Sequence, residues 1–369
     1  MLHRFLRKPE IGKIVAADKN EKLGRARTNT ALLSALYDGF TPDVEFVPMD
    51  LYDVEATAKR IKDIGPDMIV ACPSLMSWWV FAAELPKEVT ARVAEAGFGP
   101  WLPMHLMLMY KLMQAVKRSG LRVGVDLHVV STPYPDAVNV VLNKIGLAPT
   151  CGIGNIAEII SYVRLSVSQK LKVPVSNVTA YCVGHHSVEV SVFEHHSTQG
   201  IPNFLKVYVG GEPVPENKLK TEEIVSLPFP VNAGHEAHPI TIASAMPVIM
   251  GIWNDTGELC HATGPNGLPG GYPVRASASG VEVCLPQGIT MKEAIRINEE
   301  GAKADGIEEI RNDGTAVWTK KATEIMKEVL GYDCKPMRPD EIEKRAAELG
   351  NAYTSLLTKH GVKHTALRL

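Results

Sequence analysis

Two adjacent histidines close an apolar run in the stretch YCVGHHS, residues 181–187. A strand that ends at Gly184 and then presents a histidine is a way to aim an imidazole at a substrate. Imidazole is the side chain best suited to exchange protons near neutral pH. We therefore expect His186 to be the acid/base group of an active site, with hydride transfer as the first chemistry to consider. The alternative is a histidine pair that only packs or hydrogen-bonds at a strand end.

A carboxylate stands at the end of another apolar run, KIVAAD, residues 13–18. In a doubly wound sheet, an acid at a strand end commonly binds the ribose hydroxyls of a dinucleotide. Asp18 is therefore the expected ribose ligand, with helix capping or a solvated turn as the alternative. Lys19, Arg25 and Arg27 follow closely, so a 2′-phosphate is not excluded and both NAD and NADP stay open as cofactors.

Further cofactor contacts are expected where the next apolar runs, at 67–72 and 124–130, come to an end. The carboxyl ends of parallel strands lie at one edge of a sheet, and ligands bind outside that edge. The residues at these two ends are Cys72, Pro73, Ser74, Ser131 and Thr132.

Strands and helices alternate over the first 130 residues or so, which predicts an α/β fold with a Rossmann-like, doubly wound parallel sheet. The strands are continuously apolar, as in a sheet that is covered on both faces. After residue 150 the pattern becomes α+β, with a helix at 155–171, strand-like alternation at 178–192 and mostly helix after 291. We expect a cofactor-binding domain at 1–150 and a substrate domain at 151–369.

The glycine turn that normally binds pyrophosphate is missing from this pattern. A Gly-x-Gly-x-x-Gly turn and its strand are expected about 20 residues before the ribose-binding acid. Only 17 residues precede Asp18, and their one glycine is Gly12. We expect that the reading frame extends upstream and supplies this strand, since a sheet without it has unpaired edges. A truncated chain and a loss of pyrophosphate binding are the alternatives.

The composition excludes several classes of protein. Lys and Arg total 39 against 41 for Asp and Glu, so nothing steers the chain toward nucleic acid or an anionic membrane. The six cysteines form no C-x-x-C pair, which favours reduced thiols and a cytoplasmic location. No apolar run is long enough for a signal peptide or a membrane span.

The order of these motifs resembles the lactate/malate dehydrogenase superfamily over roughly residues 120–290. The resemblance rests on three motifs: a strand-end loop STPYPD at 131–136, GIGN at 152–155 before a helix, and GHHS at 184–187. Residues 10–75 resemble the NADP-binding domain of saccharopine dehydrogenase-like proteins, with a strand ending in an acid and PDMIV after the next helix. The resemblance implies an NAD(P)-dependent dehydrogenase that forms a homodimer or homotetramer.

Carried over to this sequence, the resemblance places the family's catalytic histidine at His186. That histidine would take a hydroxyl proton as hydride leaves for the nicotinamide. His185 and Asn155, in the same motifs, become substrate-site candidates. Glu158 lies one residue from the position of the carboxylate that orients the histidine, and one residue turns a helical side chain by about 100°. Arg164 falls on a second family arginine and is a candidate substrate ligand.

The family's carboxylate-gripping arginines are absent. One position holds Tyr162, and no arginine lies between Cys72 and Arg92. Without guanidinium groups the site lacks a bidentate carboxylate clamp, so the substrate is expected to differ from lactate and malate. His235 and His238 are candidates to replace them as substrate ligands, with a solvated polar loop as the alternative.

The sequence thus predicts a hydride transfer between a nicotinamide and a secondary alcohol or amine of a small metabolite. One alternative is a protein that binds NAD(P) as a sensor without turnover. Another is an NAD-dependent glycoside hydrolase, whose relatives bind a metal through a cysteine in G-x-C-N. That position is Gly154 here and Cys151 is three residues away, so we expect no metal.

Overall fold

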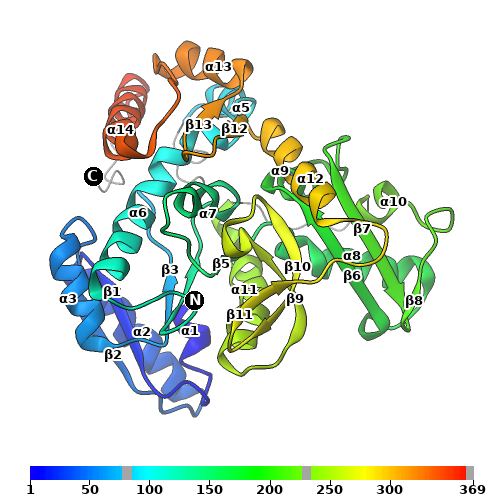
Figure 1. The fold of residues 1–369 in the computed structure, drawn as a ribbon, viewed down its shortest axis with the longest axis horizontal. Helices are drawn as coiled ribbons and strands as arrows, with labels where there is room; N and C mark the ends of the chain where they lie inside the picture. The colour runs from blue at the N-terminus through cyan, green and yellow to red at the C-terminus, as the bar shows by residue number, and fades with distance from the viewer. Residues whose placement is uncertain (77–84, 227–233, 363–369) are drawn as a thin grey trace. The chain divides into compact units, whose positions relative to one another are not determined.

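The computed structural model describes residues 1–76, 85–226 and 234–362. The chain forms two compact units (Figure 1). One contains residues 1–65 and 114–120, and the other contains residues 66–113 and 121–369. The predicted domain boundary at residue 150 falls inside the second unit and stays a prediction.

The first unit is built on two parallel strands, β1 (Ile14–Asp18) and β2 (Val44–Pro48), paired from Ile14 with Val44 to Asp18 with Pro48. Its helices are α1 (Leu2–Phe5), α2 (Glu21–Tyr37) and α3 (Val54–Ile64). Local chemistry sets where the longer helices begin. The side chains of Asn20 and Asp53 accept hydrogen bonds from backbone N–H groups in the first turns of α2 and α3.

The second unit contains a nine-stranded sheet in the order β3-β4-β5-β9-β10-β6-β7-β8, with β11 paired to β10. Only β3, β4 and β5 run parallel to one another, and the other pairs are antiparallel. The strands are β3 (Met68–Ala71), β4 (His128–Ser131), β5 (Cys151–Gly152), β6 (Val178–Gly184), β7 (Asn203–Val209), β8 (Glu212–Pro213), β9 (Glu258–Thr263), β10 (Gly271–Ser277) and β11 (Gly280–Val283).

The chain also contains further helices and a small antiparallel pair, β12 (Ile307–Ile310) with β13 (Ala316–Trp318), near its C-terminal end. The helices are α5 (Lys87–Ala94), α6 (Leu102–Ser119), α7 (Pro135–Lys144), α8 (Ile156–Leu171), α9 (His186–His195), α10 (Thr221–Val225), α11 (His238–Trp253), α12 (Met291–Ala304), α13 (Lys320–Leu330) and α14 (Ile342–Lys359). Helix α12 packs against α9 and β6 (Figure 1).

The predicted α/β class is confirmed, but the strand-like alternation expected from 178 to 192 is wrong after Gly184. Strand β6 ends there, and helix α9 begins at His186. The alternating valines of this stretch imitate a strand. In the fold, the buried positions Val188, Ser191 and Val192 have helical spacing and pack inward. Tertiary burial therefore decides the element.

A close contact at the end of β6 brings the histidines into place. A Cβ on Gly184 would stand 3.0 Å from Ile156 Cδ1, a tight contact, so glycine favours the close approach of α8 to the strand end. Ile156 belongs to a buried cluster with Val188 and Val192, which joins α8, β6 and α9. Burying each such aliphatic side chain contributes roughly 1.5–3 kcal/mol. His186 thus sits on a rigid junction.

Candidate active site

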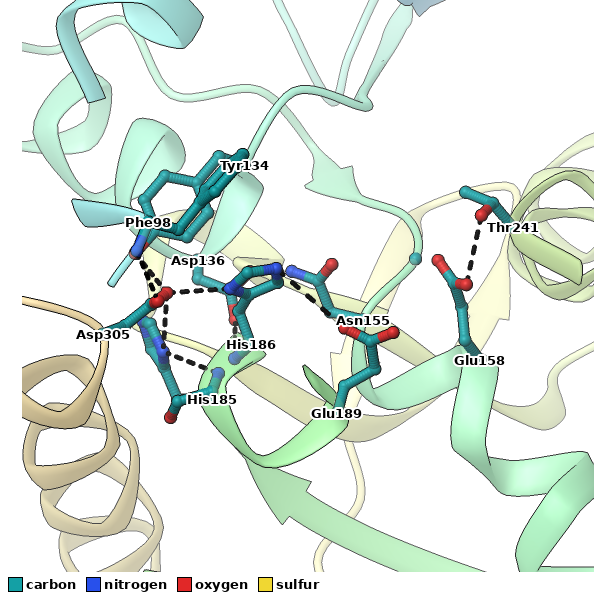
Figure 2. Close-up of polar contacts among 12 residues, drawn as sticks. Phe98, Tyr134, Asp136, Asn155, Glu158, His185, His186, Glu189, Thr241 and Asp305 are labelled. Carbon is teal, nitrogen blue, oxygen red and sulfur yellow. Dashed lines mark hydrogen bonds and ion pairs between the residues drawn. The ribbon is translucent and has the colours of Figure 1, made fainter. Parts of the chain in front are cut away.

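His186 and Asp305 form the centre of the candidate site (Figure 2). The Nδ1 atom of His186 is 2.8 Å from Oδ2 of Asp305, the residue that follows the end of α12. Asp305 is held by two further donors. The Tyr134 hydroxyl donates to Oδ2 at 2.7 Å, and the backbone N–H of Phe98 donates to Oδ1 at 2.8 Å. The carboxylate is buried and cannot turn away from the imidazole without losing these bonds.

A second carboxylate fixes the backbone of the same histidine. Oδ1 of Asp136, in the first turn of α7, accepts the backbone N–H of His186 at 3.0 Å. The other carboxylate oxygen accepts a hydrogen bond from the side-chain amide of Asn155. Asp136 therefore ties the beginning of α9 to the beginning of α8.

The Nε2 edge of His186 faces Glu189, and a second glutamate, Glu158, lies further away in the site. Glu189, one helical turn further along α9, has its Oε2 atom 3.9 Å from Nε2. Glu158, on α8, accepts a hydrogen bond from the Thr241 hydroxyl at 3.1 Å (Figure 2). The imidazole thus has a fixed carboxylate at Nδ1 and the carboxyl group of Glu189 on its Nε2 side.

These charges determine the protonation of His186. Burial disfavours its charged form, but the carboxylates of Asp305, Glu189 and Asp136 outweigh burial and raise its pKa to about 10. The pKa of Asp305 is lowered, because the attraction of His186 and its hydrogen bonds outweigh burial. Burial and the charge of Glu158 raise the pKa of Glu189 to about 8. At neutral pH the pair is an imidazolium on an aspartate.

The structure brings together four of the predicted catalytic and substrate residues: His186, Asn155, Glu158 and His185, whose Nδ1 atom is 3.7 Å from Oδ2 of Asp305. It gives the orienting contact at Nδ1 to Asp305, whereas the sequence assigned that role to Glu158, whose carboxylate is bonded to Thr241 instead. A catalytic part for Glu158 stays a prediction.

Two of the predicted substrate residues, His185 and Arg164, are not presented to a substrate at this site. His185 is 0% exposed, and its Nδ1 atom accepts from the backbone N–H of Ser187 at the start of α9. The Arg164 guanidinium donates to the carbonyl oxygens of Val178 and Val175, at 2.8 and 3.1 Å. Val178 is the first residue of β6 and Val175 lies just before it, so both are about 20 Å or more from His186 along the chain.

The remaining predicted substrate residues, His235 and His238, lie around the start of α11. His238 is the first residue of that helix. The side chain of His235 lies outside the described part of the chain. Their substrate role stays a prediction.

The predicted cofactor residues of the second unit fall at one edge of its sheet. Cys72 Sγ and Thr132 Oγ1 are 3.3 Å apart, beyond the ends of β3 and β4. Pro73 is half-buried, and the neighbouring Ser74 hydroxyl lies 3.0 Å from Nδ1 of His105. Ser131 is fully buried and donates to Asn139 Oδ1 at 2.8 Å, so it supports the fold.

In the first unit, Asp18 is the last residue of β1, as predicted for a ribose ligand. Its Oδ1 atom accepts the backbone N–H of Asn20 at 2.8 Å, which is the turn contact considered as the alternative. Lys19 is exposed, with its ammonium 5.8 Å from the centre of the Tyr52 ring.

Sequence reasoning missed four residues of the site: Asp305, Tyr134, Asp136 and Glu189. The last two carried a usable signal. Asp136 is the acid of the STPYPD loop, and Glu189 stands three residues after His186, which is a neighbouring position once the segment is known to be helical. Tyr134 lies in the same loop as Asp136, but nothing in the sequence singles out its side chain, and Asp305 lies 119 positions from His186 with no local pattern to mark it.

No protein-family model and no curated protein sequence matches this chain. Solved structures do. The malate dehydrogenase of Aeropyrum pernix superposes with a TM-score of 0.55 at 17% identity, over 83% of this chain and 94% of that chain. The chain has the fold of the lactate and malate dehydrogenases.

Two other solved structures agree with this assignment. The Plasmodium falciparum malate dehydrogenase gives a TM-score of 0.53 at 16% identity, over 88% of this chain and 95% of that chain. The Cryptosporidium parvum lactate dehydrogenase, in complex with lactic acid and nicotinamide adenine dinucleotide, gives 0.51 at 17% identity, over 82% and 91%. The predicted lactate/malate dehydrogenase layout is confirmed, and it extends over most of the chain. The saccharopine dehydrogenase-like aspect stays a prediction.

The described residues form neither a candidate metal site nor a helix that could span a membrane. They contain no group of three or more histidine, cysteine, aspartate or glutamate side chains arranged to hold a metal ion. No helix among them combines the length and apolar character needed to cross a bilayer. Because one fold hosts many reactions, the reaction has to follow from the site itself.

Proposed function

We propose that this chain is an NAD(P)-dependent oxidoreductase in which His186 exchanges a proton with the reacting oxygen or nitrogen of a small metabolite. The observation that carries the proposal is the buried hydrogen bond between His186 Nδ1 and Asp305. A carboxylate at Nδ1 fixes the orientation of the ring and stabilises the imidazolium, while Nε2 carries the proton that can be given away.

The charge state of the pair favours reduction at neutral pH. With its pKa raised to about 10, His186 is protonated and acts as a general acid. It would donate its Nε2 proton to a carbonyl oxygen or an imine nitrogen as that group is reduced. The reverse reaction needs neutral imidazole, so oxidation of the alcohol or amine should gain rate as the pH rises toward about 10.

The cofactor belongs to this proposal and is supported by the strand ends. Strands β3 and β4 pair in parallel up to Ala71 and Ser131, which puts the exposed Cys72 beside Thr132 at the carboxyl edge. A nicotinamide nucleotide bound there would supply or accept the hydride. Asp18 stays the proposed ribose ligand. The described residues contain no Gly-x-Gly-x-x-Gly turn, and we assign no partner to the pyrophosphate.

The charges around His186 restrict the substrate. Within the described part of the chain, no lysine or arginine shares a hydrogen bond or ion pair with its four neighbouring carboxylates, Asp136, Glu158, Glu189 and Asp305. A substrate carboxylate beside the reacting carbon would find no guanidinium or ammonium group among these contacts to bind it. We therefore propose a neutral or positively charged carbonyl or imine substrate, with a secondary alcohol or amine as its reduced form, in place of a 2-oxo acid.

The test is a screen of NADH and NADPH oxidation against neutral ketones, amino ketones, cyclic imines and 2-oxo acids. The expected result is turnover with one of the first three classes. His186→Gln should lower kcat by about 100-fold or more while the cofactor still binds. Cofactor binding without turnover in any class would favour a sensor, and glycoside cleavage that needs both NAD and Mn²⁺ would favour a glycosidase.

A further inference from the structure

Tyr134 has a backbone conformation that its side chain does not favour. Its φ and ψ are 45° and 55°, in the left-handed region, and it immediately precedes the first residue of α7, Pro135. Asparagine and glycine are the usual residues there, and a following proline restricts the backbone further. A bulky residue held in this region often marks a functional constraint.

The side chain of Tyr134 points into the candidate site (Figure 2). Its hydroxyl donates to Oδ2 of Asp305 at 2.7 Å, the same oxygen that lies 2.8 Å from His186 Nδ1. Its ring meets the ring of His186 edge-on, with centroids 5.4 Å apart, and that of Phe98 at 4.9 Å. Tyr134 is only 4% exposed, so no solvent path allows a substrate to use its hydroxyl.

The turn that carries Tyr134 supports the histidine from two directions. Through the side chain, Tyr134 fixes Asp305, which fixes the Nδ1 edge of His186. Two residues further on, Asp136 accepts the backbone N–H of His186. The left-handed backbone at Tyr134 lets one short segment serve both contacts.

We infer that Tyr134 is a positioning residue, whose hydroxyl holds the Asp305 carboxylate against His186 and shares its negative charge. Only the kinetic part of its test rests on the proposed function. The hydroxyl and the imidazole donate to one oxygen, so they compete for its charge. Without the hydroxyl, the carboxylate should hold the imidazolium more tightly, and His186 should become a weaker acid.

Other groups also act on the charge of His186, and the test has to leave them unchanged. The ionisable groups facing it come from several elements: Asp136 of α7, Glu158 of α8, Glu189 of α9, His185 before α9, His105 of α6 and Asp305 after α12. Tyr134→Phe removes only the hydroxyl and keeps the ring beside them.

The experiment measures the pKa of His186 in the full chain by NMR with isotope-labelled histidine, with the signal assigned from His186→Gln. In Tyr134→Phe this pKa should rise by roughly 0.5–1 unit. The matched control is Tyr162→Phe, which removes another buried hydroxyl, bonded to the Val225 carbonyl at 2.9 Å. The control should leave the pKa of His186 unchanged.

The kinetic arm uses whichever carbonyl or imine the screen identifies. Tyr134→Phe should lower kcat for reduction roughly threefold to tenfold with KM unchanged, because a weaker acid donates its proton more slowly. An unchanged pKa and kcat in a folded Tyr134→Phe protein would overturn the inference. If the wild type shows no turnover, the NMR result still decides the role of Tyr134, and only the proposed function fails.

Discussion

Replacing Asp305 by Asn tests how strongly the buried carboxylate controls His186. The asparagine oxygen can still accept from Nδ1, so the change removes mainly the charge. In the native protein the pKa of His186 rises from its ordinary 6.5 to about 10, which corresponds to about 5 kcal/mol of preference for the charged form. Asp305 is the largest favourable contributor, through its charge and its hydrogen bond.

With that charge removed, burial still disfavours the imidazolium, while Glu189 and Asp136 continue to favour it. We expect the pKa of His186 in Asp305→Asn to fall to about 7 or below. At pH 8 the protonated fraction would drop from about 99% to about 10% or less. Reduction at pH 8 should therefore slow at least about tenfold and recover in part as the pH is lowered.

The free energy of unfolding should also depend on the protonation of His186. Because the folded-state pKa of His186 is raised, its contribution is fully present below about pH 6.5 and is lost as the pH rises through about 10. Urea unfolding at pH 6 and at about pH 10.5 gives the free energy of unfolding lost between these two pH values. This loss should be about 2–4 kcal/mol larger for the wild type than for Asp305→Asn.

The assay combines NMR titration of His186 with the two unfolding experiments. Glu158→Gln is the matched control, because it removes a nearby carboxylate that has no hydrogen bond to His186 and should change its pKa far less. If His186 titrates at the same pH in Asp305→Asn as in the wild type, the role given to Asp305 is refuted.

Three further substitutions test the surroundings of the site. Glu189→Gln should raise the free energy of unfolding in urea by roughly 1–3 kcal/mol above about pH 8. The pKa of Glu189 is raised in the folded protein, so its ionisation opposes folding as the pH increases. A lower free energy of unfolding for the variant at that pH would contradict this. Gly184→Ala should lower the free energy of unfolding by roughly 1–3 kcal/mol and reduce kcat, because the added Cβ would crowd α8. The control Gly12→Ala has open space around it and should change the free energy of unfolding by about 0.5 kcal/mol or less. Arg164→Gln should lower the melting temperature and leave kcat/KM unchanged, because its guanidinium holds two backbone carbonyls. A rise in KM at unchanged stability would restore its predicted substrate role.

The sequence predicts the elements of the fold better than the contacts of the site. The apolar runs at 13–18 and 67–72 and the helix at 155–171 appear in the structure at nearly the predicted bounds, because each is a local pattern of apolar residues. The beginning of α9 was misjudged, since its valines alternate and only packing shows the helix.

The site shows the same division. His186 was predictable because a glycine and an imidazole follow a strand end. Its partner was not, because the bond to Asp305 joins residues 119 positions apart and depends on where α12 ends. The family resemblance pointed instead to α8, where Glu158 faces Thr241.

The most direct test of the central claim follows the hydride and the proton together. The protein is incubated with nicotinamide nucleotide deuterated at C4 and with the carbonyl or imine identified in the screen, and the product is analysed by mass spectrometry. We predict that the wild type transfers deuterium to the reacting carbon. His186→Gln should do so at least about 100-fold more slowly at the same cofactor occupancy. Equal transfer by the two proteins, or none by the wild type with any substrate class, would contradict the account.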